Sequence, residues 1–502
     1  MEETGLLNKF KKYSTANIFG YVMFIAYPLI FHDYFYDIVT CKFAVFIVVT
    51  IFFMIFTLII NRKNKKDDIE EKISLEEKIV FAMFWINAFS FFLSEYKIEA
   101  LTGAEGRHNG IVTIIAYLII YLCLSGLKID KEKILFAVAV GSLPVSVLGI
   151  LNFLNIDFLG FYDGLSMQYK QFYMSTLGHV NVYSSYFAIT LPVVLLLYFQ
   201  SEKRLWKFIF YFLAIINILG LICSGCESAI IILGTVFVCG LVRQKRILFS
   251  LWYVLIVTVV FLNRILVNYN NAQEEKREIS RLMKCLSNNK VIFWMIIIGG
   301  ILVLFDYVQK KHGKEKVVKI FVLSSISILF FGYVFLLVYF TFIDKERNLG
   351  KWATFLRIND EFGSYRGYIW RIVVTEFKEL SFIKKIVGIG PDALYPFVCE
   401  KYGNEMYVVT DAYYDNAHNE FLQYLITTGV AGLGAYLAFL VVKIKTFINN
   451  RRVNISKWDE IILCSCICYF VQSVVNINQV VTTPLYVIML CILNARECER
   501  KK

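Results

Sequence analysis

Residues 414–442 read YDNAHNEFLQYLITTGVAGLGAYLAFLVV. The stretch begins with a polar group around His418 and continues directly into a long apolar run. About 20 apolar residues in a helix are enough to cross roughly 30 Å of hydrocarbon. The stretch therefore predicts a membrane helix. It leaves open whether the polar residues before this helix only face water or carry out chemistry at the bilayer surface.

The whole chain has the composition of a membrane protein. Of its 502 residues, 58% are hydrophobic and 17% are aromatic. The apolar residues fall in runs of about 17 to 25, and the alternating pattern of barrel strands is absent from the sequence. Because helices satisfy their own backbone hydrogen bonds in lipid, the predicted fold class is an all-α polytopic integral membrane protein. The first apolar run lacks a small-residue cleavage site and is interpreted as a retained anchor.

Charge placement predicts how the helices are oriented. The net charge is +12, but the basic residues cluster in short loops between apolar runs. Such loops are typically cytoplasmic, so the charge indicates topology and no nucleic-acid partner. With every basic loop inside, the chain has about 14 transmembrane helices and both termini are cytoplasmic. The approximate spans are 16–31, 41–60, 79–94, 110–127, 133–154, 181–200, 207–223, 228–242, 247–267, 291–308, 317–342, 421–442, 459–477 and 484–495.

One segment differs from the rest in kind. Residues 343–417 contain no apolar run long enough to span, and the order of spans places them outside the cell. Long loops are usually functional, and SYRGYIWRIVVTEFKEL within this one has the pattern of an amphipathic helix. We therefore expect three parts: an N-terminal membrane helix bundle over 1–342, an extracytoplasmic loop segment with the catalytic motif over 343–420, and C-terminal membrane helices over 421–502.

His418 is the sharpest candidate for chemistry. A neutral imidazole near pH 7 can take a proton from a hydroxyl group. The alternative is an interfacial histidine that simply tolerates both water and lipid. Glu420, Gln423 and Thr427 continue from it at helical spacing. Because polar groups are costly in lipid, this stripe is expected to face protein or a water-filled cavity.

Three arginines on the predicted outer side form the second set of candidates. Arg366 and Arg371 belong to the amphipathic segment, and Arg107 lies in GAEGRHNG. A guanidinium binds phosphate oxygens through a fixed fork, which suits a diphosphate headgroup at the membrane face. The alternative is an ion pair with an acidic neighbour, and it is the stronger explanation for Arg371. The acidic neighbours are Asp360, Glu361 and Glu105.

Other polar motifs leave more than one interpretation. STLGHVNVYSSYFAITLPVVL, from residue 175, places His179 and Asn181 at the outer end of a span, where they either line a sugar-binding cleft or belong to the interface belt. Cys223 and Cys226 form a lone C-x-x-C, for which small apolar packing is the default. No Walker A, Asp-x-Asp or His-Glu-x-x-His motif occurs in the sequence, so nucleotide-driven work and zinc hydrolysis have no support there. We expect no metal site and no cofactor.

AHNEFLQYLITTGVAGLGAYL resembles the signature of the O-antigen ligase and polymerase superfamily. In that signature His followed by Asn, Ser or Gln is separated by nine residues from Gly-x-x-Gly, as His418–Asn419 is from Gly429 and Gly432 here. YRGYIWRIVVTEFKEL and GIGPDALYPF are similar to the family's Arg-x-x-x-Trp helix and Gly-x-Gly-x segment, and GRHNGI and LGHVNVYSSYFAITLPVVL look like recurrent family segments. The resemblance covers about residues 80–245 and 345–495.

Three features depart from the family pattern. SGCESA has Glu227 where family ligases commonly have Arg. The usual Asn-Pro-Asn becomes His179-Val180-Asn181. The spans within about 247–342 also fall outside the pattern.

The resemblance implies an inverting, metal-independent glycosyltransferase that uses a polyprenyl-diphosphate-linked oligosaccharide donor at the outer membrane face. It implies that His418 is the general base on the acceptor hydroxyl and that Arg366 holds the departing diphosphate. Further residues are expected to bind substrate: Arg107, Asn181, Asn419, Glu420 and Arg371. The partners expected are the lipid-linked donor, a glycan acceptor, the lipid bilayer and envelope polysaccharide assembly proteins.

The family's fold and motif do not separate its activities. The Lys-, Ile- and Asn-rich usage is typical of an AT-rich genome and of a bacterium without lipopolysaccharide. On that basis we expect polymerisation of the repeat units of a surface polysaccharide, with ligase-type transfer to a lipid, wall or protein acceptor as the alternative. A flippase or exporter of lipid-linked oligosaccharide is an alternative of another class. It would require polar residues deep in several spans and internal repeats, and the polar residues seen here concentrate at the outer ends. An inert anchoring protein is the third option, and the group around His418 argues against it.

Overall fold

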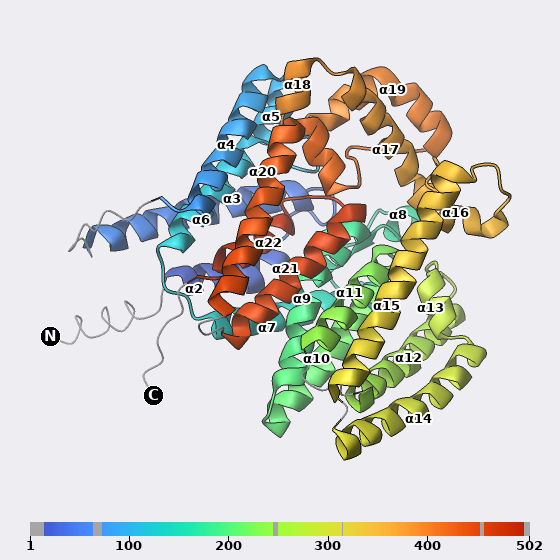
Figure 1. Ribbon diagram of the computed structural model, residues 1–502. Helices are drawn as coiled ribbons and strands as arrows, with labels where there is room; N and C mark the ends of the chain where they lie inside the picture. The colour runs from blue at the N-terminus through green and yellow to red at the C-terminus, as the bar shows by residue number, and fades with distance from the viewer. Residues whose placement is uncertain (1–14, 64–72, 244–248, 314, 452–455, 496–502) are drawn as a thin grey trace.

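The apolar runs fold into helices throughout the chain (Figure 1). The computed structural model describes residues 15–63, 73–243, 249–313, 315–451 and 456–495. Within these ranges the strands are limited to β1 (Tyr173–Met174) and β2 (Gly178–His179), which pair antiparallel in one short hairpin. The structure therefore confirms the predicted all-α class.

The first half of the chain contains the helices from α2 to α11. The first helix, α2 (Thr15–Tyr21), continues as a π turn, η1 (Val22–Ala26), and a 3₁₀ turn, η2 (Tyr27–Leu29). The next helices are α3 (Ile38–Lys63), α4 (Leu75–Leu93), α5 (Lys97–Thr102), α6 (Ile111–Ser125) and α7 (Lys131–Phe153). Around the hairpin and after it come α8 (Met167–Lys170), the 3₁₀ turn η3 (Ser175–Leu177), α9 (Val180–Gln200), α10 (Arg204–Cys223) and α11 (Ser228–Arg243).

The second half combines membrane helices with a helical segment between them. Its first helices are α12 (Phe249–Ala272), α13 (Arg281–Leu286), α14 (Asn289–His312) and α15 (Glu315–Val338), which ends in the π turn η4 (Tyr339–Ile343). The segment that follows contains η5 (Gly350–Trp352), α16 (Ala353–Leu356), α17 (Phe362–Glu379), α18 (Phe382–Val387) and α19 (Leu394–Thr410). The last elements are α20 (Glu420–Arg451), α21 (Lys457–Gln472), η6 (Ser473–Val475) and α22 (Thr483–Ile492).

The helices support a multi-pass membrane protein. In the described part of the chain, nine helices are long and apolar enough to cross a membrane: α3, α7, α9, α10, α12, α14, α15, α20 and α21. Shorter apolar helices cover Thr15–Leu29, α6, α11 and α22. Every predicted span overlaps a helix, including α4, whose first turn carries Glu76 and Glu77. The number of helices that cross the membrane stays a prediction.

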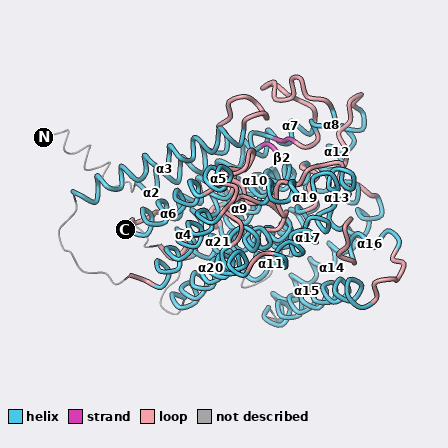
Figure 2. The backbone as a smooth tube through the Cα atoms, turned by 90° about the horizontal axis from the view of Figure 1, so that it is seen from above, coloured by secondary structure: helices cyan, strands magenta, loops and turns pink. Residues whose placement is uncertain are grey.

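Burial divides the helices into a core and an edge. Every residue from Val182 to Tyr198 in α9 is buried, because α9 is enclosed by α7, α10, α11 and α21. A helix that is apolar on all sides is expected at such a place. By contrast, α15 contains no buried residue and lies at the edge of the bundle with α14 (Figure 2). The exposed apolar side chains of these two helices are suited to contact with lipid.

The ends of the chain are interleaved. Figure 1 shows the orange and red C-terminal helices against the blue and cyan N-terminal ones, and Figure 2 shows the same bundle from above. In detail, α20 packs along α4, α21 along α9, and α22 along α6. The first and third parts predicted from the sequence therefore share one helix bundle.

The segment between α15 and α20 has a small core of its own. Buried side chains from α17 and α19 pack together and against the start of α20; they include Tyr368, Ile372, Leu394, Val398 and Ile426. The predicted amphipathic helix is α17, but Gly363, Ser364 and Tyr365 have left-handed backbone angles, so its regular part begins at Arg366. The side of the membrane on which this segment lies stays a prediction.

A backbone crossing joins this segment to α20. Helix α20 breaks at Gly429, where φ is 69° and ψ is −172°. The break frees two carbonyls. Ile426 O accepts a hydrogen bond from Ile389 N (3.0 Å), and Thr427 O accepts one from Gly390 N (3.1 Å). The hydroxyl of Ser90 in α4 also donates to Thr427 O, at 2.7 Å. These partners satisfy backbone groups that a broken helix would otherwise leave unpaired in the membrane.

Candidate functional site

The predicted site residues His418 and Arg366 come together with Arg107. They lie on three separate segments: the loop before α20, the start of regular helix in α17, and the loop between α5 and α6. Arg366, Asp415, Arg107 and His179 are all close enough to His418 to shift its pKa. The cluster of these five residues is called the His418 cluster below. It collects groups that are up to about three hundred residues apart in the sequence.

The loop that carries His418 is held from both neighbouring helices. Trp370 of α17 donates its indole N–H to Ala417 O at 2.9 Å. Gln423 of α20 accepts from Ala417 N at 3.0 Å, and Asn416 Oδ1 accepts from His418 N at 2.5 Å. These bonds stabilise a left-handed backbone at His418, where φ is 45°. The imidazole is therefore presented by a loop with a defined conformation.

The imidazole of His418 has the properties of a proton acceptor. It is half-buried, and its Nδ1 is buried without a hydrogen-bond partner among the described residues. The ring of Tyr414 meets it edge-on, with 5.5 Å between ring centroids. Burial and then the Arg366 guanidinium lower the pKa of His418 to about 3, against the opposite effect of Asp415. His418 is therefore neutral at neutral pH, with a nitrogen free to take a proton.

Arg366 supplies a cation that has no counterion in the described part of the chain. It is half-buried and forms no hydrogen bond or ion pair with any residue that the structure describes. The left-handed residues before it set where it projects, and they are tied to the His418 loop because Tyr414 donates its hydroxyl to Ser364 O at 3.0 Å. The geometry leaves the guanidinium fork available to an anion.

Arg107 is held differently, in a buried ion pair. Its Nε and Nη2 donate to the two carboxylate oxygens of Asp415 at 2.8 and 2.5 Å, and its side chain is almost inaccessible. Burial raises the pKa of Asp415, but the charge and hydrogen bonds of Arg107 outweigh it and leave the pKa below its ordinary value. The ion pair offered as the alternative for Arg107 is therefore present, but its partner is Asp415 and not Glu105. The pair links the α5–α6 loop to the His418 loop.

Asp392 was missed by the sequence analysis. It follows Gly390 and Pro391 with a left-handed backbone, and its Oδ2 accepts from Ala104 N at 2.9 Å and Asn109 N at 3.1 Å. Burial raises the pKa of Asp392 to about 7, although the nearby Arg107 and the two backbone donors act against this. The carboxyl fixes the loop that presents Arg107. Its signal in the sequence was its place directly after the Gly-x-Gly segment.

His179 is the second imidazole of the His418 cluster. Its Nδ1 accepts from Asn181 N at 3.2 Å, and its ring stacks on Phe172 with 6.1 Å between centroids. Burial, Arg107 and Arg366 lower the pKa of His179 to about 4, while Asp415 acts in the opposite direction. Like His418, it is neutral at neutral pH. In the sequence it occupies the first position of the altered Asn-Pro-Asn triplet.

Two predicted substrate-binding residues lie at the start of α20. Asn419 caps the helix, because its Oδ1 accepts from Phe421 N and Leu422 N at 3.0 Å each. Glu420 is buried, and its Oε1 accepts from Asn478 at 3.3 Å. Both side chains also line the cavity described below. Their contact with substrate stays a prediction.

Asn181 and Arg371 already have protein partners. Asn181 accepts a hydrogen bond from Asn476 on its carbonyl, at 2.9 Å, and from Cys226 Sγ on its side chain, at 3.1 Å. Arg371 is exposed and binds both carboxylate oxygens of Asp360, at 2.8 and 2.9 Å. For Arg371 this is the ion pair offered as the alternative. A role of either residue in substrate binding stays a prediction, and for Arg371 it requires this pair to open.

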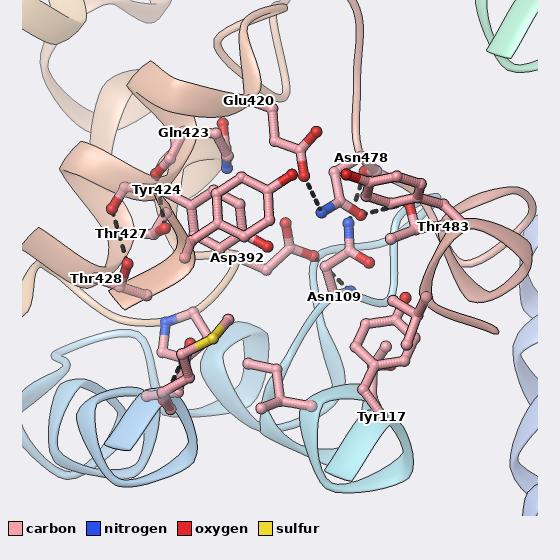
Figure 3. Close-up of a pocket in the computed structure, with 18 of the residues that line it drawn as sticks. Asn109, Tyr117, Asp392, Glu420, Gln423, Tyr424, Thr427, Thr428, Asn478 and Thr483 are labelled. Carbon is pink, nitrogen blue, oxygen red and sulfur yellow. Dashed lines mark hydrogen bonds between the residues drawn. The ribbon is translucent and has the colours of Figure 1, made fainter. Parts of the chain in front are cut away.

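A cavity of about 170 Å³ adjoins the His418 cluster between α4, α6, α20 and α22. Polar residues line one part of it, and Figure 3 shows Asn109, Asp392, Glu420 and Asn478 around this part. The remaining lining includes Met83, Phe84, Leu118, Phe439 and Leu490. Glu420, Gln423 and Thr427 all line the cavity, so the stripe faces the inside of the protein and not lipid, as predicted. The cavity connects the polar cluster to the apolar interior of the bundle.

The described ranges contain no group of three or more His, Cys, Asp or Glu side chains that could hold a metal ion. Independence from metals stays a prediction, because a diphosphate substrate can bring a cation of its own.

Comparison with known proteins identifies the segment that carries these motifs. Residues 279–437 match the family model described as O-antigen ligase. The match includes α17 with Arg366, the Gly388–Gly390 crossing, and His418 with the break at Gly429. Neither the search of curated proteins nor the search of solved structures found a match. Residues 279–437 of this multi-pass membrane protein are thus similar to the O-antigen ligase family, and this match supports a function in glycan transfer at the membrane during surface polysaccharide synthesis.

Proposed function

We propose that the protein is a glycosyltransferase that polymerises the repeat units of a surface polysaccharide at the outer face of the cell membrane. Its donor is an oligosaccharide linked to a polyprenyl diphosphate. The observation that carries the proposal is the His418 cluster, which joins a neutral imidazole to Arg366, an arginine that has no counterion among the described residues. Transfer from a diphosphate needs these two groups, a base for the attacking hydroxyl and a cation for the leaving group.

The proposed reaction is a single displacement. The acceptor oxygen bonds to the anomeric carbon while the bond from that carbon to the diphosphate oxygen breaks, and attack from the opposite face inverts the anomeric configuration. The hydroxyl proton passes to His418. The electron pair leaves with the diphosphate, whose negative charge Arg366 stabilises through a fixed fork. No metal has a step in this scheme.

The charges around His418 link donor binding to its basicity. In the free protein, burial and the Arg366 and Arg107 guanidinium groups lower the pKa of His418 to about 3, which makes the imidazole a weak base. A bound diphosphate brings negative charge beside these cations, and an opposite charge nearby favours the protonated imidazole. The donor thus raises the basicity of His418 at the moment when a base is needed.

The cavity supports a lipid-linked donor. Its apolar lining between α4, α6, α20 and α22 suits an isoprenoid chain, and its polar end adjoins the His418 cluster. A substrate with an apolar tail and an anionic headgroup matches a cavity that is apolar along its length and polar at the end beside the His418 cluster.

Ligase-type transfer to a lipid, wall or protein acceptor uses the same chemistry and is the alternative. An assay of the purified protein in detergent, with a lipid-linked repeat unit and EDTA, distinguishes polymerase, ligase and flippase activity. A polymerase makes a ladder of lengths, a ligase makes one product with its acceptor, and a flippase makes no new bond. We expect the ladder.

His418 provides the direct test of the proposal. Loss of the general base is expected to lower the extension rate by about 10²- to 10⁴-fold. His418→Ala should remain inserted while single lipid-linked repeats accumulate. His418→Asn keeps polarity and hydrogen bonding but cannot accept the proton at neutral pH, so it should resemble Ala. Glycan length is compared on gels at matched protein levels. Chain lengths of wild type from His418→Asn would reject the base and return His418 to an interfacial role.

A further inference from the structure

A second hollow, of about 470 Å³, lies beside the β1–β2 hairpin and away from the helix-lined cavity. It forms where the loop between η2 and α3 meets the loop that leads from α7 to the hairpin. Four of its lining residues are aromatic: Phe35, Tyr36, Tyr169 and Tyr173. We call this place the aromatic hollow.

The floor of the aromatic hollow is tightly packed. The ring of Phe35 stacks on Tyr173, with 4.9 Å between centroids and 26° between planes. On its other sides it contacts Phe161 at 5.1 Å and Tyr162 at 5.5 Å. Phe35, Phe161 and Tyr162 are all buried. The floor therefore offers a rigid aromatic surface.

Hydrogen bonds hold the loops under this floor. The carboxylate of Asp157 accepts from Phe161 N at 2.9 Å and from Tyr162 N at 2.6 Å. The hydroxyl of Tyr162 donates to Tyr173 O at 3.0 Å, and the guanidinium of Arg277 covers the Tyr162 ring at 4.9 Å from its centroid. The hollow is thus preformed, which favours binding because little has to be ordered when a ligand arrives.

The rim of the aromatic hollow is open and uncharged. The side chains of Tyr36 and Tyr169 are 67% and 58% exposed, and Ser166 adds an exposed hydroxyl. Even a Cβ added at Gly164 would come no closer than 3.8 Å to the Tyr36 hydroxyl. No charged side chain belongs to the described lining. Aromatic faces with a few hydroxyls suit the C–H face and hydroxyl groups of a neutral sugar, whereas phosphate calls for cations.

The hairpin connects the aromatic hollow to the His418 cluster. Tyr173, which lines the hollow, pairs with His179 across β1 and β2. Phe172 stacks on the His179 ring, and its carbonyl accepts from Val180 N at 2.9 Å. His179 in turn is close enough to His418 to act on its pKa. A row of rings therefore leads from the hollow to the candidate catalytic base.

We propose that the aromatic hollow is a saccharide subsite, which holds neutral sugar units of the glycan chain at a distance from the bond that is made. The inference rests on the proposed function, because that function brings a chain of several sugars to the His418 cluster. Either the acceptor or the donor chain can supply the bound sugars. In both cases the ligand chemistry is a pyranose stacked on Tyr36 and Tyr169.

A direct binding experiment tests the subsite. The probe is free oligosaccharide of a few repeat units, released by mild acid from the surface polysaccharide of cells that carry the protein. Its affinity for the purified full chain is measured by saturation-transfer NMR titration. The double variant Tyr36→Ala/Tyr169→Ala is expected to bind the oligosaccharide at least about tenfold more weakly than wild type does. Tyr36→Phe/Tyr169→Phe keeps both rings and should bind within about twofold of wild type.

Two further variants guard against misinterpretation. Ser166→Trp fills the hollow from an exposed position without removing a ring, and it should also lose binding, so the test survives if the double variant does not fold. Phe382 is 78% exposed outside the hollow, and Phe382→Ala controls for exposed aromatic residues that only anchor the protein at the interface. The subsite would be overturned if Tyr36→Ala/Tyr169→Ala and Ser166→Trp both bound the oligosaccharide like wild type. It would also be overturned if Phe382→Ala lost as much affinity as they do.

Binding and catalysis are measured separately, so the two proposals can fail independently. His418→Ala should bind the free oligosaccharide like wild type and should not extend a lipid-linked repeat. Wild-type extension without oligosaccharide binding rejects the subsite alone. In a second outcome, wild type binds the oligosaccharide, the hollow variants do not, and wild type extends no lipid-linked repeat. This outcome supports the subsite and rejects the proposed polymerase. If the protein extends the free oligosaccharide, the hollow binds the acceptor chain. If the oligosaccharide only slows the extension of lipid-linked repeats, the hollow binds the donor chain.

Discussion

Arg366 and Arg107 show two ways in which an arginine can stand near an anion site. Arg107 is buried and neutralised by Asp415, so its charge mainly holds two loops together. Arg366 has no such partner among the described residues, so its whole charge is open to substrate. Of the two, Arg366 is the better placed to receive a leaving group.

Removing Arg366 should therefore slow the reaction strongly. We expect Arg366→Ala to lower the extension rate by about 10²- to 10³-fold, the usual cost of losing one preorganised contact to developing charge. Arg366→Lys should recover only part of the rate, because a point charge replaces a planar fork. Lys378→Ala removes an exposed cation from the same helix and serves as the control. Full activity of Arg366→Ala in membranes, at normal expression, would show that the guanidinium has no part in the reaction.

Asp392 should make stability depend on pH. Its pKa is raised from 3.8 to about 7 in the folded protein, so the folded state binds a proton more tightly than the unfolded state. Its contribution to stability is therefore lost as pH rises from about 4 to about 7. Asp392→Asn keeps an oxygen for the two backbone donors and removes the ionisation. Relative to wild type, its melting temperature should rise by about 2 °C or more between pH 5 and pH 8. A difference that stays constant or falls with pH would contradict the protonated carboxyl.

These residues also show what the sequence could and could not reveal about the site. His418 and Arg366 were found because each belongs to a local motif with a characteristic spacing. The pairing of Asp415 with Arg107 and the role of Asp392 were not predicted, because their partners Arg107 and Ala104 lie hundreds of residues away and come near only in the fold. The aromatic hollow was missed for the same reason, since its rings come from two separate loops. Spacing along one segment says nothing about which loops meet.

At the scale of elements, the crossing of α20 by the Gly388–Gly390 segment joins two motifs of the family resemblance. A Cβ at Gly429 would lie 2.1 Å from Ile386 O, and one at Gly388 would lie 2.1 Å from Thr427 O. Both glycines also have positive φ, so they are required by close approach and by backbone conformation together. Hydropathy predicted the span but could not reveal the break inside it, because glycine is common in unbroken membrane helices.

Gly429→Ala should therefore disrupt the junction on which the His418 loop depends. We expect a loss of about 3 kcal/mol or more in stability, because the new methyl group meets a backbone carbonyl that cannot move alone. Gly434→Ala is the matched control in the same helix, since a Cβ there meets nothing within 4 Å. It should be neutral or stabilising by up to about 1 kcal/mol. Equal melting temperatures of the two purified variants would contradict the crossing.

At the scale of the whole molecule, hydropathy identified the membrane helices but not their arrangement. Composition alone separates apolar runs from polar loops, and each predicted span overlaps a helix. That α9 lies at the centre and α15 at the edge depends on which helices pack against them, because both sequences are apolar enough to span a membrane. The interleaving of α20 with α4 has no signal in either helix taken separately.

The orientation of the bundle is the prediction on which the location of the reaction depends. In a cysteine-depleted background, a membrane-impermeant maleimide should label Ser364→Cys in intact cells, because residues 343–417 are expected outside. Ser364 is exposed on the protein surface, so access is not limited by burial. Lys311→Cys, in a basic loop expected inside, should react only after lysis. Protection of Ser364→Cys until lysis would place the His418 cluster on the wrong side for a surface polysaccharide.

The crossing at Gly429 also has a consequence for biosynthesis. Ile389 N, Gly390 N and Ser90 Oγ find their acceptors on Ile426 and Thr427, which a ribosome reaches only after it has made the greater part of the chain. Until then the hydrogen-bonding groups of these earlier segments have no such acceptors, and the His418 loop is not yet anchored to α20. A chain that stops before residue 426 therefore lacks all of these acceptors, and we expect activity only after most of the chain has been made.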